Sequence, residues 1–337
     1  MANNSKKDII NRKKKLFVKN EKVLLDPEAK SLADFEWSPN LKLLAYSGPY
    51  INKIENLNTL INLEHLRLIG GRISKIENLE NLQSLKFLDL SANNISEIEG
   101  LENLKNLEVL RFGNTFELTG GNPIKEIKGL ENLKILKELR FIQNEIIAIS
   151  GLEKLKRLEI LDLRSNSITE IEGLVSLTNL KELYLGGNKI IEIRRLNDLK
   201  KLEILELGGN KITRINGLDN LSNLKELHLD FNDITEITNL NSLEKLERLY
   251  LFNNNIKEIQ GLENLKNLIE LDLSQNKIQE IKGLENLKNL TDLNLSYNKI
   301  LEIKGIENLV NLKRLGLHDN PIKKFSGIES PKDLIIY

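Results

Sequence analysis

The chain has 337 residues, and 49 Lys and Arg balance 49 Asp and Glu, so its formal net charge is zero. This balance excludes a whole-molecule attraction to nucleic acid or to an acidic membrane. The absence of cysteine excludes disulfides, thiol chemistry and cysteine-based zinc sites. Apolar residues recur every two or three positions and never form the run of roughly 18 that a membrane span requires. The basic start has no apolar stretch behind it and does not match a secretory signal, so we expect a soluble, cytoplasmic protein.

Residues 1–15 are predicted to be a flexible basic tail, which contains the run Arg12–Lys15. Such a run can contact anionic lipid, nucleic acid or an acidic protein, but more often it is simply solvated. Residues 16–40 are predicted to form an N-terminal cap. Leu16–Val18 and Val23–Leu25 flank a polar segment, which indicates a hairpin. Asp26–Pro27 is a typical helix start, and the helix would use the apolar residues Ala29, Leu32 and either Phe35 or Trp37 to cover the leucines that begin at Leu41.

Residues 41–333 repeat one phrase, LxxLxLxxNxIxxIxxLxxLxx. The phrase begins 13 times, at Leu41, Leu63, Leu85, Leu107, Leu136, Leu158, Leu180, Leu202, Leu224, Leu246, Leu268, Leu290 and Leu312. The first part alternates apolar and polar residues, which predicts a short strand. The second part spaces apolar residues by three, which suits tight 3₁₀ or irregular turns. No unit can bury its apolar positions alone, so the units are predicted to stack into a solenoid with one continuous core.

These residues resemble those of leucine-rich repeat proteins. The 22-residue length, with Ile-xx-Ile followed by Gly-Leu-Glu-Asn-Leu, is similar to the class found in the nuclear regulatory subunit of protein phosphatase 1 and in bacterial internalins. The resemblance implies an α/β solenoid, a right-handed horseshoe superhelix with a parallel β-sheet on its concave face and 3₁₀ or irregular turns on its convex face. Many extracellular members carry cysteine-stapled caps, so the lack of cysteine favours an intracellular location.

An asparagine precedes the first isoleucine in 11 of the units. Its carboxamide can donate to and accept from backbone groups that would otherwise be buried without partners, so we expect a structural ladder of stacked asparagines. Pro49 and Gly71 replace it in the first two units, where the ladder should be absent. At the other end Pro331 replaces a leucine and stops the pattern. Residues 334–337 are therefore predicted to close the core.

The candidate functional residues are the outward positions of the strands, where the repeat imposes no apolar choice. An arginine patch in the N-terminal half comprises Arg67, Phe87, Arg111 and Arg140. An acidic–aromatic patch from the seventh unit onward comprises Glu182, Tyr184, Glu206, Glu226, His228, Asp230, Phe231, Arg248, Tyr250 and Phe252. Exposed Tyr, Phe and Arg dominate contact energies between proteins, and surrounding acids supply complementarity. The alternative is an ordinary charged sheet surface with scattered aromatics.

The favoured function is a non-catalytic scaffold, a monomer whose concave face binds one partner protein. The resemblance to the phosphatase regulator implies a sharper version, control of a metallophosphatase, but only core positions match, so no contact residue carries over. An internalin-type adhesin at the cell surface is an alternative, although the export signal and anchor of such proteins are not seen here. Nucleic acid is not an expected partner.

Catalysis has weak support in the sequence. The histidines lie many units apart and cannot converge. His228 and Asp230 could hold a metal only with Glu206 or Glu226 as further ligands. An open sheet face is not expected to desolvate the acids enough to separate their pKa values. We therefore expect no enzyme, no metal and no cofactor, with a hydrolase built on Glu206, His228 and Asp230 as the remaining alternative.

The one irregular step in the repeat lies between Leu107 and Leu136, where 29 residues replace 22. Counting from both sides keeps Phe112 and Asn122 in the template, so the seven extra residues within 113–121 are expected to bulge from the sheet edge. Gly120 and Gly121 offer the freedom to rejoin the bend. Phe116 and Leu118 predict an accessory contact that overhangs the concave face, and the alternative is a tolerated surface insertion.

Overall fold

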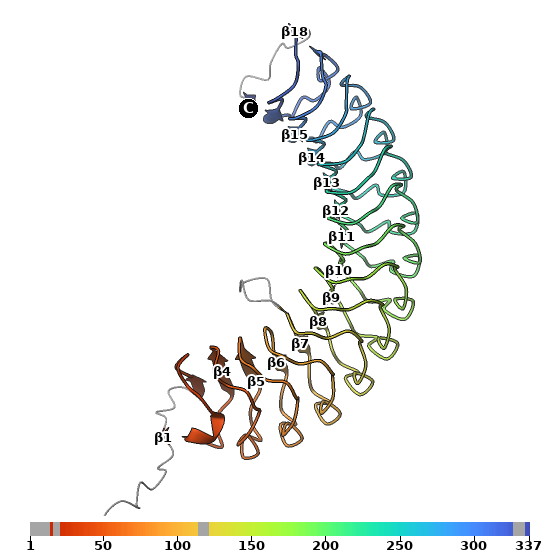
Figure 1. The fold of residues 1–337 in the computed structure, drawn as a ribbon. Coiled ribbons are helices and arrows are strands. Elements are labelled where there is room, and N and C mark those ends of the chain that lie inside the picture. Colours follow the sequence, from red (N-terminus) through yellow and green to blue (C-terminus); the bar gives the residue numbers. More distant parts are fainter. Residues whose placement is uncertain (1–13, 16–20, 114–120, 326–333) are drawn as a thin grey trace, which may run out of the picture.

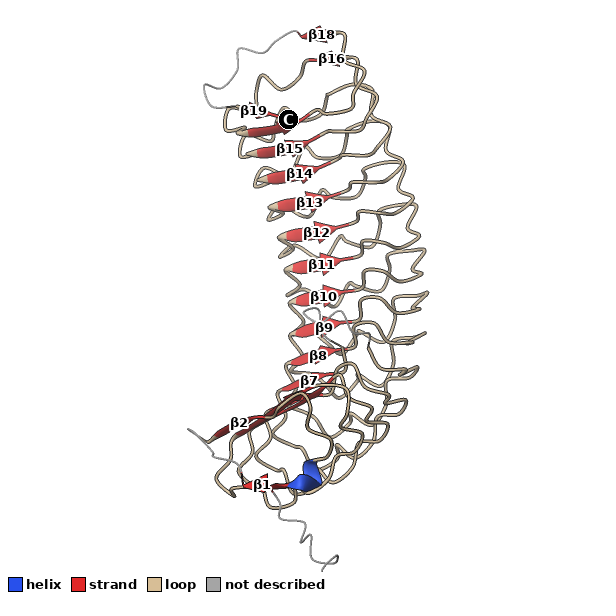
Figure 2. Cartoon of the chain, turned by 60° about the vertical axis from the view of Figure 1, so that its left-hand side comes forward, coloured by secondary structure: helices blue, strands red, loops and turns tan. Residues whose placement is uncertain are grey.

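The computed structural model describes residues 14–15, 21–113, 121–325 and 334–337. The chain forms an arc of stacked turns with its strands along the inner side (Figure 1). In Figure 2 the same strands lie one above another as a single row. The predicted solenoid with a concave parallel sheet is therefore confirmed. Phe116, Leu118, Pro331, Leu16–Val18 and most of the basic tail lie outside the described residues.

The main sheet has 15 strands in the order β19-β17-β15-β14-β13-β12-β11-β10-β9-β8-β7-β6-β5-β4-β2, and two smaller sheets pair β1 with β3 and β16 with β18. The strand bounds are β1 Lys14–Lys15, β2 Lys22–Leu24, β3 Phe35–Glu36, β4 Leu43–Ser47, β5 His65–Ile69, β6 Phe87–Asp89, β7 Val109–Arg111, β8 Glu138–Arg140, β9 Ile160–Asp162, β10 Glu182–Tyr184, β11 Ile204–Glu206, β12 Glu226–His228, β13 Arg248–Tyr250, β14 Glu270–Asp272, β15 Asp292–Asn294, β16 Glu302–Ile303, β17 Arg314–Gly316, β18 Lys324–Phe325 and β19 Ile335–Ile336. The one described helix is the 3₁₀ helix η1, Leu32–Asp34. No helix in the described ranges is both long and apolar enough to cross a membrane.

The register of the sheet aligns equivalent leucines of successive turns. Leu161 of β9 lies beside Leu183 of β10, and both are fully buried. A slip of one residue would turn these leucines to the solvent, so burial fixes the register. On the convex side Leu177 N donates to Leu174 O and Leu180 N donates to Leu177 O, each at 2.9 Å. These bonds span three residues, as the spacing predicted.

The asparagine ladder is present and spans neighbouring turns. Asn188 Nδ2 donates to Leu185 O of its own turn at 2.9 Å and to Leu163 O of the preceding turn at 3.0 Å. Its Oδ1 accepts from Ile168 N of the preceding turn at 3.0 Å. Each side chain therefore fastens two turns together and satisfies backbone groups that the bend leaves buried.

The ladder is absent from the first two turns, as predicted, and a tyrosine takes over its role. The Tyr46 hydroxyl accepts from Tyr50 N at 2.9 Å and donates to Pro27 O at 3.2 Å. Gly71 occupies the asparagine position of the next turn, where a Cβ would lie 2.4 Å from Ile51 O. The close approach of Ile51 therefore requires glycine there.

The predicted helix at Asp26–Pro27 is wrong. Asp26 Oδ1 accepts from Glu28 N at 2.9 Å and Asp26 O accepts from Ala29 N, which closes a single turn. The only helical segment among the described residues is η1, whose N-cap is Ser31. A helix start signal can stabilise one turn. A longer helix also needs an apolar face whose packing offsets the free-energy cost of nucleation. Here the covering residues Ala29, Leu32, Phe35 and Trp37 are buried as predicted, but from a mostly extended chain.

The insertion leaves the core template intact but breaks one step of the ladder. Ile95 N donates to Asn122 Oδ1 at 3.0 Å, so Asn122 keeps its predicted place. In the next turn Asn144 Oδ1 is buried and has no hydrogen-bond partner among the described residues. Gly121 does more than provide freedom, because a Cβ there would lie 2.0 Å from Gln143 O. The chain thus returns to the template pressed directly against the following turn.

At the C-terminal end β19 pairs with β17 in parallel. Leu334 packs against the core, whereas Ile335 is 61% exposed. The segment predicted to close the core therefore mainly extends the sheet by one strand.

Candidate protein-binding face

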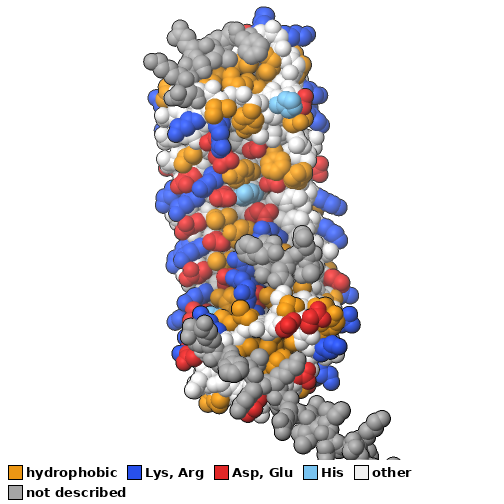
Figure 3. Space-filling model, turned by 90° about the vertical axis from the view of Figure 1, so that its left-hand side faces the viewer, with side chains coloured by type: hydrophobic (Ala, Val, Ile, Leu, Met, Phe, Trp, Pro, Cys, Tyr) orange, Lys and Arg blue, Asp and Glu red, His pale blue; other side chains and the backbone are white. Residues whose placement is uncertain are grey.

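Most of the described candidate residues lie on strands of the concave sheet. Figure 3 shows this face, on which charged and apolar side chains are interspersed. Strand residues alternate between core and concave face, so the residues on either side of the buried middle leucine point outward together. The candidates on the strands are Arg67 on β5, Phe87 on β6, Arg111 on β7, Arg140 on β8, Glu182 and Tyr184 on β10, Glu206 on β11, Glu226 and His228 on β12, and Arg248 and Tyr250 on β13. Asp230, Phe231 and Phe252 lie two or three residues after the ends of β12 and β13.

In the arginine patch, the Phe87 ring lies between two guanidinium groups. Arg67 Cζ is 5.5 Å and Arg111 Cζ is 5.1 Å from the centre of the ring. Both distances are in the range of cation–π attraction. Arg67 also lies 3.8 Å from the fully buried Asp89. The predicted arginines and Phe87 are thus brought together, but their charges are already engaged within the chain.

A network of alternating charges crosses β7, β8 and β9, and the sequence-based prediction missed three of its members. Glu138 Oε1 accepts from Arg111 Nε at 2.7 Å and from Arg140 Nε at 2.5 Å. Asp162 Oδ2 accepts from Arg140 Nη1 at 3.1 Å and from Arg164 Nη2 at 2.6 Å. Burial raises the pKa of Glu138, but hydrogen bonds from the two arginines outweigh burial, and its pKa is lowered. Writing successive units side by side would have revealed the alternation of sign.

Glu206 of the acidic–aromatic patch lies folded against the backbone of the preceding turn. A Cβ on Gly186 would lie only 1.9 Å from Glu206 Oε1, so a side chain there would displace the carboxylate from its place. Glu206 Oε2 is buried without a hydrogen-bond partner in the described ranges, 3.8 Å from Arg164 Nε. Desolvation raises the pKa of Glu206 to about 7, although the Arg164 charge opposes the rise.

The expectation that an open sheet face cannot desolvate its acids is therefore wrong for Glu206. The space left by Gly186 takes in the carboxylate, and the neighbouring turns shield it from water. Gly186 does not have the positive φ that Gly187 has, 63°, so its role is space and not backbone conformation.

Aromatic rings of neighbouring turns stack in the acidic–aromatic patch. The His228 and Tyr250 rings lie 4.4 Å apart in a stacked arrangement. His228 Nε2 is 2.7 Å from Glu226 Oε1, and Glu226 Oε2 accepts from Arg248 Nη1 at 3.4 Å. The predicted residues of β12 and β13 therefore form one connected cluster.

Phe231 lies at the bend position before the ladder asparagine, which is left-handed in other turns as well, with φ of 56° at Ser165 and 54° at Asn253. Its φ is 50°, in the left-handed region, and its side chain is 50% exposed. Gly187 and Gly209 occupy the same position in the two preceding turns, with φ of 63° and 66°. A residue with a side chain in this region costs roughly 1–2 kcal/mol relative to a right-handed one. The ring meets that of Phe252 edge-on, with centroids 4.9 Å apart.

The sequence model of a family described as Leucine Rich repeats (2 copies) matches residues 83–132 and, in overlapping copies, residues 156–330. These matches cover more than half of the chain. The chain belongs to the leucine-rich repeat family. Among curated protein sequences, none matches the chain.

Solved structures of leucine-rich repeat proteins share this architecture. An internalin, InlF of Listeria monocytogenes, is 27% identical, with 80% of this chain and 84% of that chain covered and a TM-score of 0.69. A leucine-rich repeat protein of Leptospira interrogans is 26% identical, with coverages of 89% and 90% and a TM-score of 0.65. The plant peptide hormone receptor RGFR1, solved with RGF2, is 22% identical, with coverages of 96% and 57% and a TM-score of 0.68.

The leucine-rich repeat fold and its internalin neighbours support a role in protein–protein interaction. They confirm the predicted 22-residue, internalin-like repeat class. None of the matches described above concerns a phosphatase regulator, so that part of the resemblance stays a prediction.

The residues of the hydrolase alternative are near one another but do not converge on one point. His228 Nε2 contacts Glu226, and His228 Nδ1 lies 3.9 Å from Asp230 Oδ1. The Glu206 carboxylate instead lies against Gly186 and Arg164. Within the described part of the chain no group of three or more His, Asp and Glu side chains is placed to hold a metal ion.

Proposed function

We propose that this leucine-rich repeat protein is a non-catalytic cytoplasmic scaffold that binds a partner protein on its concave face, through the acidic–aromatic patch. The observation that carries the proposal is Phe231. Its half-exposed ring occupies a left-handed position that glycine fills in the two preceding turns. The repeat imposes this backbone conformation in other turns as well, so the signal is the large apolar ring that stays half exposed there and its contact with Phe252.

The partner would contribute an apolar side chain to the rings of Phe231 and Phe252 and basic side chains to the surrounding acids. Large aromatic residues that keep their exposure are the usual centres of binding energy. The acids of this patch outnumber its one arginine, whereas Arg111 and Arg140 of the other patch are paired with Glu138 and Asp162. The acidic half of the concave face therefore has more charge to offer to a partner.

The proposal is tested by affinity capture from native lysate followed by quantitative mass spectrometry. The double variant Phe231→Ala with Phe252→Ala should lose the captured partner while its melting temperature stays within a few degrees of the wild type. Tyr297→Ala is the matched control, because Tyr297 is equally exposed at the same position of a later turn, with φ of 57°. Equal capture by the double variant and the wild type would rule the patch out.

Control of a metallophosphatase is the finer version of this proposal and rests on the sequence resemblance alone. A direct assay adds the purified chain to the catalytic subunit of such a phosphatase and measures both binding and turnover. No change in either quantity at micromolar concentrations would remove the phosphatase from the proposal and leave the scaffold in place.

An internalin-type adhesin is the second candidate, favoured by the likeness to InlF over 80% of the chain. Cell fractionation with surface proteolysis separates the two, because an adhesin is cleaved on intact cells and a cytoplasmic scaffold is protected. A screen for hydrolase activity, with His228→Ala as its control, tests the non-catalytic assignment.

A further inference from the structure

A row of alternating charges runs along one flank of the solenoid, formed by the residue after the first leucine of each unit. Ten consecutive turns alternate without exception, as Lys42, Glu64, Lys86, Glu108, Lys137, Glu159, Lys181, Glu203, Lys225 and Glu247. Each lysine after the first contacts the glutamate of the turn before it, and Lys42 contacts Glu21. The five Nζ–Oε2 distances are 2.7 to 2.8 Å.

The alternation stops at the eleventh turn, where Ile269 stands in place of a lysine and Thr291 follows in place of a glutamate. Glu247 therefore has no lysine in the next turn, and its ion pair among the described residues is with Arg248 at 3.9 Å. Lys313 faces Thr291 and makes no ion pair within the described ranges. Ile269 is 42% exposed between these two charges.

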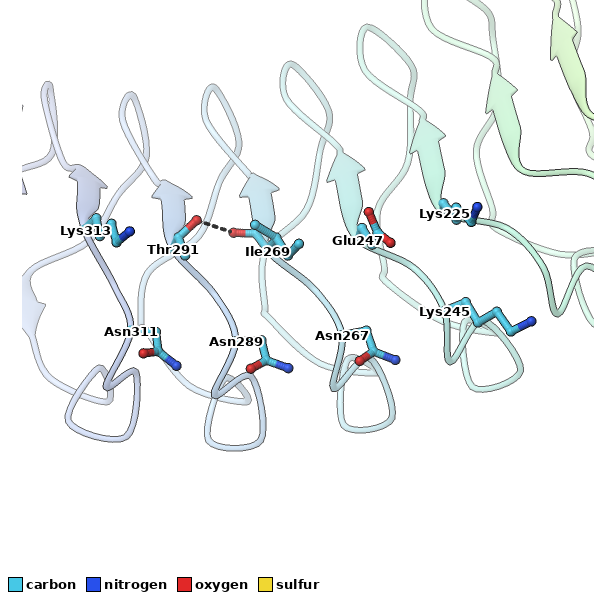
Figure 4. A pocket seen from close by; sticks show the side chains of 9 residues that line it. All are labelled: Lys225, Lys245, Glu247, Asn267, Ile269, Asn289, Thr291, Asn311 and Lys313. Carbon is cyan, nitrogen blue, oxygen red and sulfur yellow. Dashed lines mark hydrogen bonds between the residues drawn. The ribbon is translucent and has the colours of Figure 1, made fainter.

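A second row, of three asparagines, lies beside this interruption (Figure 4). Asn267, Asn289 and Asn311 each donate through Nδ2 to a carbonyl of the preceding turn, at 2.8, 2.9 and 2.8 Å. Their Oδ1 atoms accept no hydrogen bond from any described residue. In earlier turns the equivalent oxygens of Asn179 and Asn223 accept from Lys201 and Lys245, each at 2.7 Å.

The two rows enclose an open groove of about 600 Å³. Its wall from the flanking row presents one carboxylate, one apolar side chain, one hydroxyl and the ammonium groups of Lys225 and Lys313. Its other wall presents three carboxamide oxygens that can accept hydrogen bonds, and the ammonium group of Lys245. Part of this lining is already engaged, because Thr291 Oγ1 donates to Ile269 O and Asp292 Oδ2, and Lys225 and Lys245 contact Glu203 and Asn223. The groups that the groove offers to a ligand are therefore the Glu247 carboxylate, the Ile269 side chain, the Lys313 ammonium group and the three carboxamide oxygens.

The spacing of the groove matches an extended peptide. Neighbouring turns of a parallel sheet lie about 4.8 Å apart, so Glu247 and Lys313, three turns apart, are separated by roughly 14 Å. Residues i, i+2 and i+4 of an extended chain line one face and span roughly 13–14 Å. One face of five extended residues can therefore place a cation at Glu247, an apolar side chain at Ile269 and an anion at Lys313.

We propose that this groove binds an extended segment of a partner protein in which a Lys or Arg, an apolar residue and an Asp or Glu occupy every second position. The segment supplies the two charges that the flanking row lacks, and its apolar side chain covers Ile269. Its main-chain N–H groups donate to the oxygens of the asparagine row. The site lies on the flank and not on the concave face, so it adds a second binding surface to the proposed scaffold.

The test is fluorescence polarisation with the full chain and three labelled peptides. The first peptide carries Lys-Ser-Leu-Ser-Glu between glycine–serine ends. The second has serine in place of the leucine, and the third has lysine in place of the glutamate. We expect the first peptide to bind at least tenfold more tightly than either of the others. Equal affinity for the three peptides, or no binding at millimolar concentration, overturns the proposal.

A variant that restores the alternation provides the second arm. Ile269→Lys with Thr291→Glu recreates pairs that the chain already forms in five other places, so the fold should survive. This variant should lose at least tenfold in affinity for the first peptide. The control is Ile191→Lys with Val175→Glu, which adds the same charges at exposed positions outside the groove. If the restored variant binds as tightly as the control, the groove is not the binding site.

Discussion

Glu206 and Arg164 face each other across two turns of the concave sheet without forming a hydrogen bond. Glu206 Oε2 lies 3.8 Å from Arg164 Nε and is buried, with no other partner in the described part of the chain. Arg164 is instead held by Asp162, 2.6 Å from its Nη2. A buried carboxylate with an incomplete set of partners favours its protonated form.

Glu206 should make the protein less stable as the pH rises. Its folded pKa of about 7 exceeds the ordinary 4.5, so between these values the folded state binds more protons than the unfolded state. The free energy of unfolding therefore falls as pH rises through this window. Glu206→Gln removes the effect and should be more stable than the wild type by about 1–3 kcal/mol at pH 8, with little gain at pH 4.5. Urea denaturation at the two pH values measures it, and a gain that is equal at both would contradict the assignment.

Glu138 should show the opposite sign. Hydrogen bonds from Arg111 and Arg140 lower its pKa, so its contribution to stability is present above the ordinary pKa and is lost as pH falls through the folded pKa. Glu138→Gln leaves two partly buried guanidinium groups with a neutral partner, and should cost about 1–3 kcal/mol at pH 7. The same denaturation series tests this, because the cost should shrink below pH 4. A cost that is constant down to pH 3 would mean that charge is not its origin.

The asparagine ladder should contribute unequally along the chain. Asn188 makes hydrogen bonds through both atoms of its carboxamide, so Asn188→Ala should lower the free energy of unfolding by roughly 2–4 kcal/mol. Asn144 lacks a partner at Oδ1, and Asn144→Ala should cost less by about 1 kcal/mol. Thermal and chemical denaturation of the two variants compare the same substitution at equivalent positions. Equal costs would show that the hydrogen bond missing at Asn144 Oδ1 does not affect the free energy of unfolding.

Phe231 should separate stability from binding. Asn253 occupies the same position in the following turn with φ of 54°, and asparagine tolerates this conformation better than phenylalanine. Phe231→Asn should therefore leave the free energy of unfolding unchanged or raise it by up to about 1 kcal/mol. Capture of the concave-face partner should nevertheless fall. A loss of more than about 2 kcal/mol would show that the ring acts in folding, since losses of that size come from core packing.

Removing the seven extra residues should restore a regular turn. Deleting 114–120 leaves Gly113 and Gly121 as the two-residue connection that other units have before the ladder asparagine. Ile124 N could then donate to Asn144 Oδ1 as in the other turns, so the melting temperature should be maintained or rise. Differential scanning calorimetry measures the folding effect, and partner capture tests the predicted accessory contact of Phe116 and Leu118. A shortened chain that fails to fold would show that the insertion is structural.

The sequence predicted the fold in detail because the strand, turn and bend signals within each unit agree with one another. Alternating leucines specify a strand, three-residue spacing specifies a turn, and asparagine satisfies the bend between them. The same reasoning failed at Asp26–Pro27, because a local start signal does not show whether later packing offsets the cost of helix nucleation. It also placed the candidate residues on one face, because outward positions follow directly from the repeat.

The sequence by itself determined the solenoid, the ladder from Asn93 onward and the location of the two patches, since these depend on a period that can be counted. Only the tertiary structure decided which side chains neutralise one another across turns. Asp162 is fully buried although its position in the strand points outward, and Glu206 is desolvated because Gly186 leaves room for it. Burial and pKa depend on atoms 22 or more residues away in the chain, which stacking brings within a few ångströms. The period fixes the backbone position of each side chain, but its neighbours in the adjacent turns decide its burial, its ion pairs and its pKa.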